Sequence, residues 1–241
     1  MRSILGNLRR TVQENNMIEE GDRVAVGLSG GKDSMVLLAL LATFKRFAPF
    51  HFDLEAITIH PGFDNFDLSE IEAFCKHYDV PYTIVKTDIA HVVFDIRKEK
   101  NPCSLCANMR RGILSSTMNE RNLNKLALGH HQDDRINTFF MNMLYTGKLN
   151  TMEYKSYLSR TNVHVIRPLL NVPESQILSY VKQHEVPVAK SPCPVDKHTK
   201  REEIDKFAHS IYQDIPRSRA SIVKALINKE QSNLFKEKDD Q

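Results

Sequence analysis

The stretch "VAVGLSGGKDSMVLL", residues 24–38, decides the fold of this 241-residue chain. A valine-rich run of strand length leads into a loop with two adjacent glycines, and the loop leads into an apolar segment of helical length. A Walker A phosphate-binding loop would need Gly-x-x-x-x-Gly-Lys-Ser/Thr, but Val26 stands five positions before Gly31 and Asp33 follows Lys32. The stretch therefore predicts an anion-binding strand–loop–helix unit of another kind.

The residue types in this loop favour a pyrophosphate bound together with Mg²⁺. Adjacent glycines let backbone N–H groups converge on an anion, and the start of the following helix adds partial positive charge. A carboxylate in the loop would repel a phosphate unless a divalent cation lay between them. A plain glycine-rich turn capped by Ser34 is the alternative. The candidate ligand-binding residues are Ser29, Gly30, Gly31, Lys32, Asp33 and Ser34.

Strand and helix patterns alternate around the loop. Apolar runs of strand length occur at residues 22–29, 54–60, 81–89, 125–131 and 163–170. Helical patterns occur at residues 34–47, 67–78, 104–122, 133–147 and 173–185. This alternation predicts an α/β fold with a parallel five-stranded sheet, helices on both faces, and short helical N- and C-terminal extensions. Right-handed crossovers would place every strand-to-helix turn at one edge of the sheet, where ligands bind.

The composition is that of an ordinary globular protein, with 41% hydrophobic and 26% charged residues. No apolar run approaches the roughly 18 residues of a membrane span, and the N-terminal residues lack the pattern of a signal peptide. We therefore expect a cytoplasmic protein with no membrane partner. The net charge of +3 permits a nucleic-acid partner without requiring one.

The four cysteines divide into two groups. Cys103 and Cys106 form a C-x-x-C pair at the start of a predicted helix, and Cys193 follows about 90 positions later. Structural zinc usually has four protein ligands, so three cysteines are a poor zinc set. A [4Fe-4S] cluster with one iron free of protein ligand is one interpretation, although the usual cluster has four cysteines. A thiol redox pair with an unrelated Cys193 is the alternative. Cys75 shares a helix face with apolar residues and is predicted to lie in the core.

The segment "GHHQDD", residues 129–134, ends the fourth predicted strand. Gly129 would let the backbone approach a ligand, and Asp133 or Asp134 could hold Mg²⁺ beside the loop. Two alternatives stay open. Asp133 could simply cap the following helix, or the histidines and carboxylates could form the metal centre of a hydrolase.

Residues 29–34, directly after an apolar strand, resemble the PP-loop of the N-type ATP pyrophosphatases. Those enzymes cut ATP between the α and β phosphates and adenylate an oxygen of the substrate. Further stretches look like the tRNA 2-thiocytidine synthetase family, and the likeness extends from about residue 8 to about residue 193. These stretches are "NMIEEGDRVAVGLSGGKDS" (16–34), "CSLCANMRRGIL" (103–114), "LALGHHQDD" (126–134), "FFMNMLYTGKL" (139–149) and "VIRPL" (165–169).

The resemblance implies a PP-loop fold, similar to the adenine nucleotide alpha hydrolases, at residues 20–190. Residues 1–19 would form an N-terminal helical extension, and residues 191–241 a C-terminal helical segment that carries the third cysteine. The implied activity is an ATP-dependent tRNA sulfurtransferase: adenylation of O2 of a tRNA cytidine and its replacement by sulfur. The implied cofactors are ATP, Mg²⁺ and a [4Fe-4S] cluster held by Cys103, Cys106 and Cys193.

The resemblance also assigns roles to single residues. It places His130 and Asp133 near the ATP, and it gives backbone groups at Thr58 and Ile59 to the adenine. We expect Asp33 and Asp133 to be catalytic through Mg²⁺. Arg110 and Arg111 lie between the cysteines and the nucleotide, where either could stabilise charge at the adenylated base, bind tRNA phosphate or face solvent. Arg167 is expected at the ligand edge of the sheet.

The chain departs from the family at the third cysteine. Better-known members carry a second cysteine at the position that Asp196 occupies here. Either Cys193 reaches across to the cluster, or Asp196 is a fourth, labile oxygen ligand.

The implied partners are tRNA and a sulfur donor, either a cysteine desulfurase or sulfide; a homodimer is left open. Basic clusters at 9–10, 98–100, 197–201 and 217–224 could bind tRNA phosphates or be ordinary solvated helix faces. Two other classes of function compete with thiolation. The first is an adenylating ligase similar to tRNA lysidine synthetases, which needs no cysteines. The second is a non-enzymatic sensor that binds ATP and metal but releases no pyrophosphate.

Overall fold

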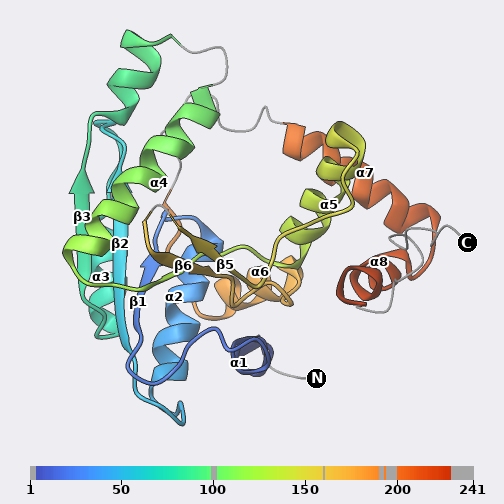
Figure 1. Ribbon diagram of the computed structural model, residues 1–241, viewed down its shortest axis with the longest axis horizontal. Helices are drawn as coiled ribbons and strands as arrows, with labels where there is room; N and C mark the ends of the chain where they lie inside the picture. The colour runs from blue at the N-terminus through green and yellow to red at the C-terminus, as the bar shows by residue number, and fades with distance from the viewer. Residues whose placement is uncertain (1–3, 99–101, 160, 190–192, 194–199, 229–241) are drawn as a thin grey trace, which may run out of the picture. The chain divides into compact units, whose positions relative to one another are not determined.

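The computed structural model describes residues 4–98, 102–159, 161–189, 193 and 200–228 (Figure 1). They fall into two compact units. The first takes in the described residues of Met1–Asp133 and Glu153–Lys197, and the second those of Asp134–Met152 and His198–Gln241. This grouping differs from the predicted domains 1–19, 20–190 and 191–241, whose boundaries stay a prediction.

The first unit is built on a six-stranded sheet with the order β3-β2-β1-β4-β6-β5. Every neighbouring pair is parallel except β5 and β6, which are antiparallel. The α/β class and the mostly parallel sheet are therefore confirmed. The strands are β1 (Arg23–Gly27), β2 (Asp53–His60), β3 (Tyr82–Lys86), β4 (Lys125–Ala127), β5 (Lys155–Leu158) and β6 (Val163–Ile166).

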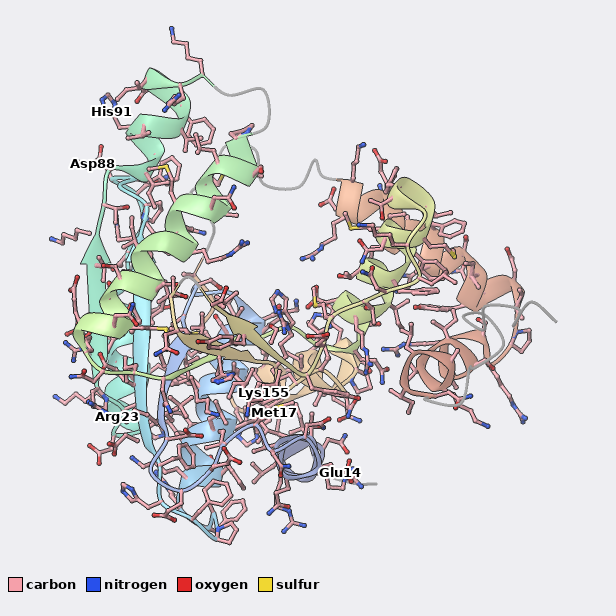
Figure 2. The ribbon with its side chains drawn as sticks, in the orientation of Figure 1. Glu14, Met17, Arg23, Asp88, His91 and Lys155 are labelled. Atoms are coloured by element: carbon pink, nitrogen blue, oxygen red, sulfur yellow. The ribbon has the colours of Figure 1, made fainter. Side chains whose placement is uncertain are left out.

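The predicted count of five strands is wrong by one, because β5 carries no strand signal of its own. Its sequence, "KSYL", is short and half polar, and it pairs only at the edge of the sheet. Tertiary contacts hold it there. Arg167 Nη1 donates to the carbonyl of Glu153 (2.8 Å) and to Ser156 Oγ (3.2 Å). Lys155, labelled in Figure 2, donates from its Nζ to the carbonyl of Asn16 (3.2 Å). Arg167 thus fastens the edge strand to its neighbour.

Helices cover both faces of the sheet. One core cluster joins α1, α2, α3 and α6 to one face, and a second joins η1 and α4 to the other. In the first unit these are α1 (Ile4–Glu14), α2 (Lys32–Lys45), α3 (Ser69–His77), the π-helical η1 (His91–Ile96), α4 (Pro102–Glu120) and α6 (Glu174–Gln183). α2 is apolar nearly all round because the sheet, α1 and α6 all contact it.

The second unit consists of helices with a small apolar core of its own. It contains most of α5 (Gln132–Thr146) together with α7 (Lys200–Asp214) and α8 (Ser218–Ile227). None of the helices in the described part of the chain has the length and hydropathy that a bilayer-spanning helix requires.

The order of the strands fixes where a ligand can bind. The chain runs outward from β1 to β2 and β3 on one side, then returns to place β4 on the other side of β1. The carboxyl ends of β1 and β4 therefore flank a topological switch point, the usual ligand crevice of such sheets. The loop after β1 and the residues after β4 both lie at this edge.

A glycine makes the close approach at this edge possible. A Cβ atom added at Gly129 would lie 2.9 Å from both the carbonyl carbon of Asp33 and the amide nitrogen of Ser34, and 3.0 Å from the carbonyl oxygen of Asp33. These neighbours are backbone atoms at the start of α2, so they cannot rotate away. Only glycine fits at position 129 without moving the loop.

We predict that Gly129→Ala lowers the free energy of unfolding by about 1–3 kcal/mol, because the added methyl forces backbone atoms apart. Gly112→Ala is the matched control. Its Cβ would meet nothing within 4 Å, so it should leave the protein equally or more stable. Chemical denaturation of both variants measures the difference. Equal stability of the two variants would show that the contact at Gly129 is not constraining.

Candidate functional site

The loop between β1 and α2 is closed by its own hydroxyl groups. Ser34 Oγ donates to the carbonyl of Gly31 (2.9 Å), and the backbone N–H of Ser29 donates to Ser34 Oγ (3.2 Å). The N–H of Gly31 donates to Ser29 Oγ (3.3 Å). α2 begins after its N-cap residue Gly31, which has no side chain to cap the helix, so the Ser34 hydroxyl bonds within the loop instead. The first turn of α2 can therefore direct its N–H groups at an anion.

Lys32 makes two ion pairs at the mouth of this loop. Its Nζ lies 3.2 Å from Asp33 Oδ2 and 2.9 Å from Glu174 Oε1 at the start of α6. Burial alone would lower the pKa of Lys32, but the carboxylates of Glu174 and Asp33 outweigh burial and raise the pKa above its ordinary value. The ammonium group is therefore charged and positioned where a polyphosphate would compete with two carboxylates.

A buried histidine lies between the two predicted magnesium ligands. His131 Nε2 is 3.7 Å from Asp33 Oδ1, and His131 Nδ1 is 3.7 Å from Asp133 Oδ2. The backbone N–H of Asp133 donates to His131 Nδ1 (3.3 Å), which leaves Nε2 to carry the ring proton toward Asp33. The imidazole thus links Asp33 to Asp133 across the site.

The structure separates the two aspartates that follow β4. Asp133 Oδ2 accepts a hydrogen bond from the backbone N–H of Glu174 (2.8 Å), so it caps α6 and lies in the first unit. Asp134 belongs to the second unit, where its Oδ1 lies 3.6 Å from Nη1 of Arg201. These contacts place Asp133 at the start of α6, where its carboxylate caps that helix.

A cavity of about 220 Å³ adjoins the loop and gathers several predicted residues. Five of the candidates line it: Ser29, Thr58, Ile59, Arg110 and Arg111. The rest of its wall is mostly apolar and consists of Gly27, Leu28, Ile57, Phe66, Leu114, Leu126 and Leu128. Apolar walls with a few polar groups suit an aromatic base beside the phosphate loop. Residues 30–34, Gly129 and His130 lie outside this lining.

Backbone geometry favours Ile59 over Thr58 as a contact for a base. Pairing between β1 and β2 ends at Gly27 and Ile57, and the N–H of Leu28 then donates to the carbonyl of Ile57 (2.8 Å). In a parallel strand, alternate residues turn their N–H and C=O groups to the same side. Those of Ile59 therefore face the side from which β1 has departed, whereas the hydroxyl of Thr58 is used to hold the carbonyl of Leu28 (2.8 Å).

α4 carries two of the predicted thiolates and the two arginines. Burial raises the pKa of the Cys106 thiol; the charge of Arg110 opposes this shift, and Cys193 and Cys103 add to it. Cys103 and Cys193 are thus each close enough to Cys106 to interact with it electrostatically. Arg110 also lines the cavity of about 220 Å³, and its buried Nε has no hydrogen-bond partner among the described residues. Arg110 therefore stands between the thiols and the cavity.

The described residues contain no group of three or more His, Cys, Asp or Glu side chains already placed at metal-binding distances. The cysteines nonetheless approach one another from two distant parts of the chain. His130 lies on the segment after β4 with its Nδ1 buried. Asp196 lies outside the described residues, so its predicted role stays untested.

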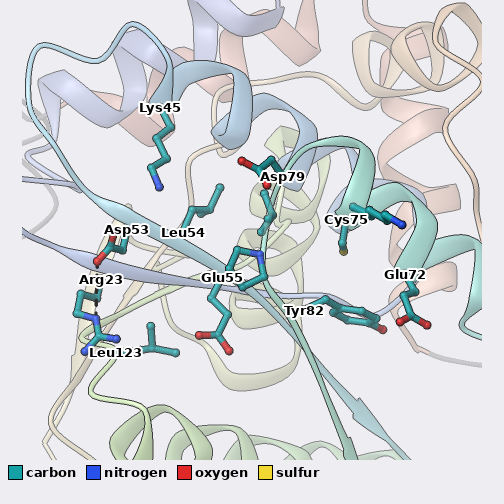
Figure 3. A pocket seen from close by; sticks show the side chains of 13 residues that line it. Arg23, Lys45, Asp53, Leu54, Glu55, Glu72, Cys75, Asp79, Tyr82 and Leu123 are labelled. Carbon is teal, nitrogen blue, oxygen red and sulfur yellow. Dashed lines mark ion pairs between the residues drawn. The ribbon is translucent and has the colours of Figure 1, made fainter.

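A larger cavity, about 690 Å³, lies at the amino ends of the strands (Figure 3). Cations and carboxylates alternate on its walls, as in the pair formed by Arg23 and Asp53 (3.9 Å). Its one thiol, Cys75, is buried in the core as predicted, and burial, aided by Glu72, raises the pKa of Cys75 to about 12. This cavity offers no consistent charge and no active nucleophile, so we assign the chemistry to the carboxyl edge.

Residues 5–208 match the PP-loop domain family. The chain belongs to that family. The predicted resemblance is confirmed, because two curated relatives are named tRNA-cytidine(32) 2-sulfurtransferase. The protein from Syntrophotalea carbinolica is 35% identical and covers 94% of this chain and 88% of its own length. The one from Dichelobacter nodosus is 36% identical and covers 94% and 85%.

A solved structure supports the same PP-loop assignment. The U34-tRNA thiolase NcsA from Methanococcus maripaludis, described with its [4Fe-4S] cluster, superposes with a TM-score of 0.74 and 28% identity. The match covers 92% of this chain and 77% of the thiolase.

Sequence reasoning missed two residues of the PP-loop site. The pair "HH" at 130–131 gives no signal that tells which histidine turns toward Asp33. Glu174 was missed because only the fold brings the start of α6 to Lys32.

We predict an order of thiol reactivity in the reduced, metal-free protein. Iodoacetamide attacks thiolates, so the exposed Cys103 should react faster than Cys106, and Cys75 should stay unmodified until the protein unfolds. Arg110→Gln should slow Cys106 further at pH 8, because losing the positive charge raises the pKa of Cys106 and lowers its thiolate fraction. Peptide mass spectrometry over time gives the rates. Equal rates for Cys75 and Cys103 would contradict the core assignment.

Proposed function

We propose that this chain is an ATP-dependent tRNA sulfurtransferase that adenylates O2 of a tRNA cytidine and replaces that oxygen with sulfur. The observation that carries the proposal is the position of Arg110, which lines the cavity beside the PP-loop and interacts with Cys106. Nucleotide chemistry and thiol chemistry therefore share one helix. The names of the relatives supply the substrate class, tRNA.

The loop supplies the groups that would bind the pyrophosphate part of ATP. Backbone N–H groups at the start of α2 and the charged Lys32 are donors suited to an anion. The base would lie in the apolar cavity against the backbone of Ile59. This arrangement leaves the α-phosphate near Ser29, where the loop and the cavity meet.

The carboxylates of Asp33 and Asp133 are candidate magnesium ligands because each supplies oxygen atoms. The imidazole of His131 lies between them, so each carboxylate is a candidate by itself. Mg²⁺ bound there would neutralise charge that builds up on the leaving pyrophosphate. Both side chains already have partners: Asp33 pairs with Lys32, and Asp133 accepts from the N–H of Glu174, so a bound ion would replace part of these contacts.

Arg110 and Arg111 are the candidates for stabilising charge at the α-phosphate and the attacked base. A guanidinium group is always charged and can bind two oxygens at once. Arg110 faces the cysteines as well as the cavity, so it also favours the thiolate form of Cys106.

Cys106 interacts electrostatically with Cys103 and Cys193, and the remaining cysteine, Cys75, is buried in the core. Three cysteine ligands fit a [4Fe-4S] cluster in which one iron has no protein ligand. The [4Fe-4S] cluster that Cys103, Cys106 and Cys193 would hold supplies, when bound, an iron that can accept exogenous sulfide. We further propose that the sulfur comes from a cysteine desulfurase or from free sulfide, that the protein acts in the cytoplasm, and that a homodimer is a candidate assembly.

The test of this function is nucleoside analysis of tRNA from cells with and without the protein. We expect 2-thiocytidine to disappear without it and to return with the wild-type chain. Unchanged 2-thiocytidine would overturn the proposal. Turnover that survives replacement of all three ligand cysteines would favour a lysidine synthetase-like ligase, and ATP binding without pyrophosphate release in the presence of tRNA would favour a sensor.

We predict that Asp33→Asn lowers tRNA-dependent pyrophosphate release at least about 100-fold. The change removes a carboxylate that would hold the Mg²⁺ ion, and this ion would neutralise the charge that builds up on the leaving pyrophosphate in the transition state. Asp53→Asn is the matched control, since it removes an exposed carboxylate that pairs with Arg23 at the opposite edge of the sheet. A coupled pyrophosphate assay measures both. Equal rates for the two variants would remove Asp33 from the mechanism.

We predict that Cys193→Ser loses most of the iron of anaerobically purified protein, which should hold about four irons per chain when intact. A hydroxyl is a much harder ligand than a thiolate, so the cluster should not assemble. Cys75→Ala should retain its iron, because Cys75 lies in the apolar core. Iron retained in Cys193→Ser but lost in Cys75→Ala would show that Cys75, and not Cys193, is the third ligand.

A further inference from the structure

Gly112 has no packing reason to be glycine. It lies inside α4, where glycine costs about 1 kcal/mol relative to alanine. A Cβ atom at this position would meet nothing within 4 Å. Gly129, by contrast, is pressed against backbone atoms. The absence of a side chain at Gly112 therefore leaves open space beside α4, and no neighbouring atom requires that absence.

That open space is a cavity of about 410 Å³ in the first unit. α4 forms one wall, and the end of β5 with Ser159 and Thr161 forms the other. The volume lies within the range of about 300–1,000 Å³ that is usual for ligand sites. The lining residues are Asn108, Arg111, Gly112, Ser115, Tyr157, Leu158, Ser159 and Thr161.

The lining favours an anionic, hydroxylated ligand. It offers a guanidinium group, an amide and several hydroxyls, and none of the described residues that line it carries a carboxylate. Guanidinium, amide and hydroxyl side chains are the groups that contact phosphate and sugar in nucleic acids. The exposed helix backbone at Gly112 would allow a ribose-phosphate chain to come close.

The cavity adjoins the nucleotide site. Arg111 lines both cavities, so they lie next to each other along α4. An RNA strand bound against Gly112 would place its neighbouring nucleotide beside Arg111, within reach of the cavity that Ser29 lines.

We propose that this cavity holds the ribose-phosphate backbone of the substrate RNA next to the nucleotide that reacts, and that Gly112 keeps it open. The proposal rests on the proposed function, which supplies the RNA. The structure supplies the cavity, the hydrogen-bond donors that line it and the glycine that leaves it open.

The test is a size series at position 112. Gly112→Ala adds one methyl group and Gly112→Gln adds a long neutral side chain, and both residues favour helix more than glycine does. Ser116→Gln is the matched control, because it adds the same side chain to an exposed position of α4 outside the cavity lining. The probe is an unmodified tRNA transcript with a cytidine at position 32, bound at fixed salt concentration.

We expect Gly112→Gln to weaken tRNA binding at least about tenfold, with Gly112→Ala in between and Ser116→Gln unchanged. The melting temperature should stay level or rise in the series, and the affinity for ATP should not change. A structural role for Gly112 would instead lower the melting temperature.

Unchanged tRNA affinity in Gly112→Gln, with the wild type binding and thiolating tRNA, would overturn this inference and leave the proposed function intact. Weakened ATP binding with normal tRNA binding would also overturn it, because the cavity would then belong to the nucleotide. A wild type that releases no pyrophosphate with tRNA would refute the proposed function itself.

Discussion

The contact between Gly129 and the peptide joining Asp33 to Ser34 is the constraint on which the site depends. It lets the end of β4 lie directly against the first turn of α2. His131 and Asp133 follow within four residues, so the same approach delivers the imidazole to Asp33 and the carboxylate to the start of α6. A side chain at position 129 would push these groups outward together.

α4 serves two cavities because successive side chains of a helix point in different directions. Cys106 and Arg110 are one turn apart and share a side, which explains why the arginine influences the pKa of that thiol. Asn108, Arg111 and Ser115 follow the same spacing on the side that faces the end of β5. Arg111 lies where the two sides meet, and it lines both cavities.

The parts that the sequence predicts well are those encoded by local pattern. The valine run of β1 and the loop after it are adjacent in the chain, and Cys75 shows its burial through the apolar residues on its helix face. The edge strand β5 could not be predicted, because a residue outside its own sequence, Arg167, fastens it to the sheet. The pairing of Lys32 with Glu174 likewise joins residues that only the fold brings together.

The two carboxylates on Lys32 have a consequence for the catalytic cycle. An ammonium group already neutralised by Glu174 and Asp33 contributes less to nucleotide affinity than an isolated one would, since binding exchanges one set of anionic oxygens for another. Under the proposed function, the same exchange would run in reverse at the end of the reaction. Glu174 would pair with the lysine again as pyrophosphate departs, so this internal counter-ion would favour product release over tight ground-state binding.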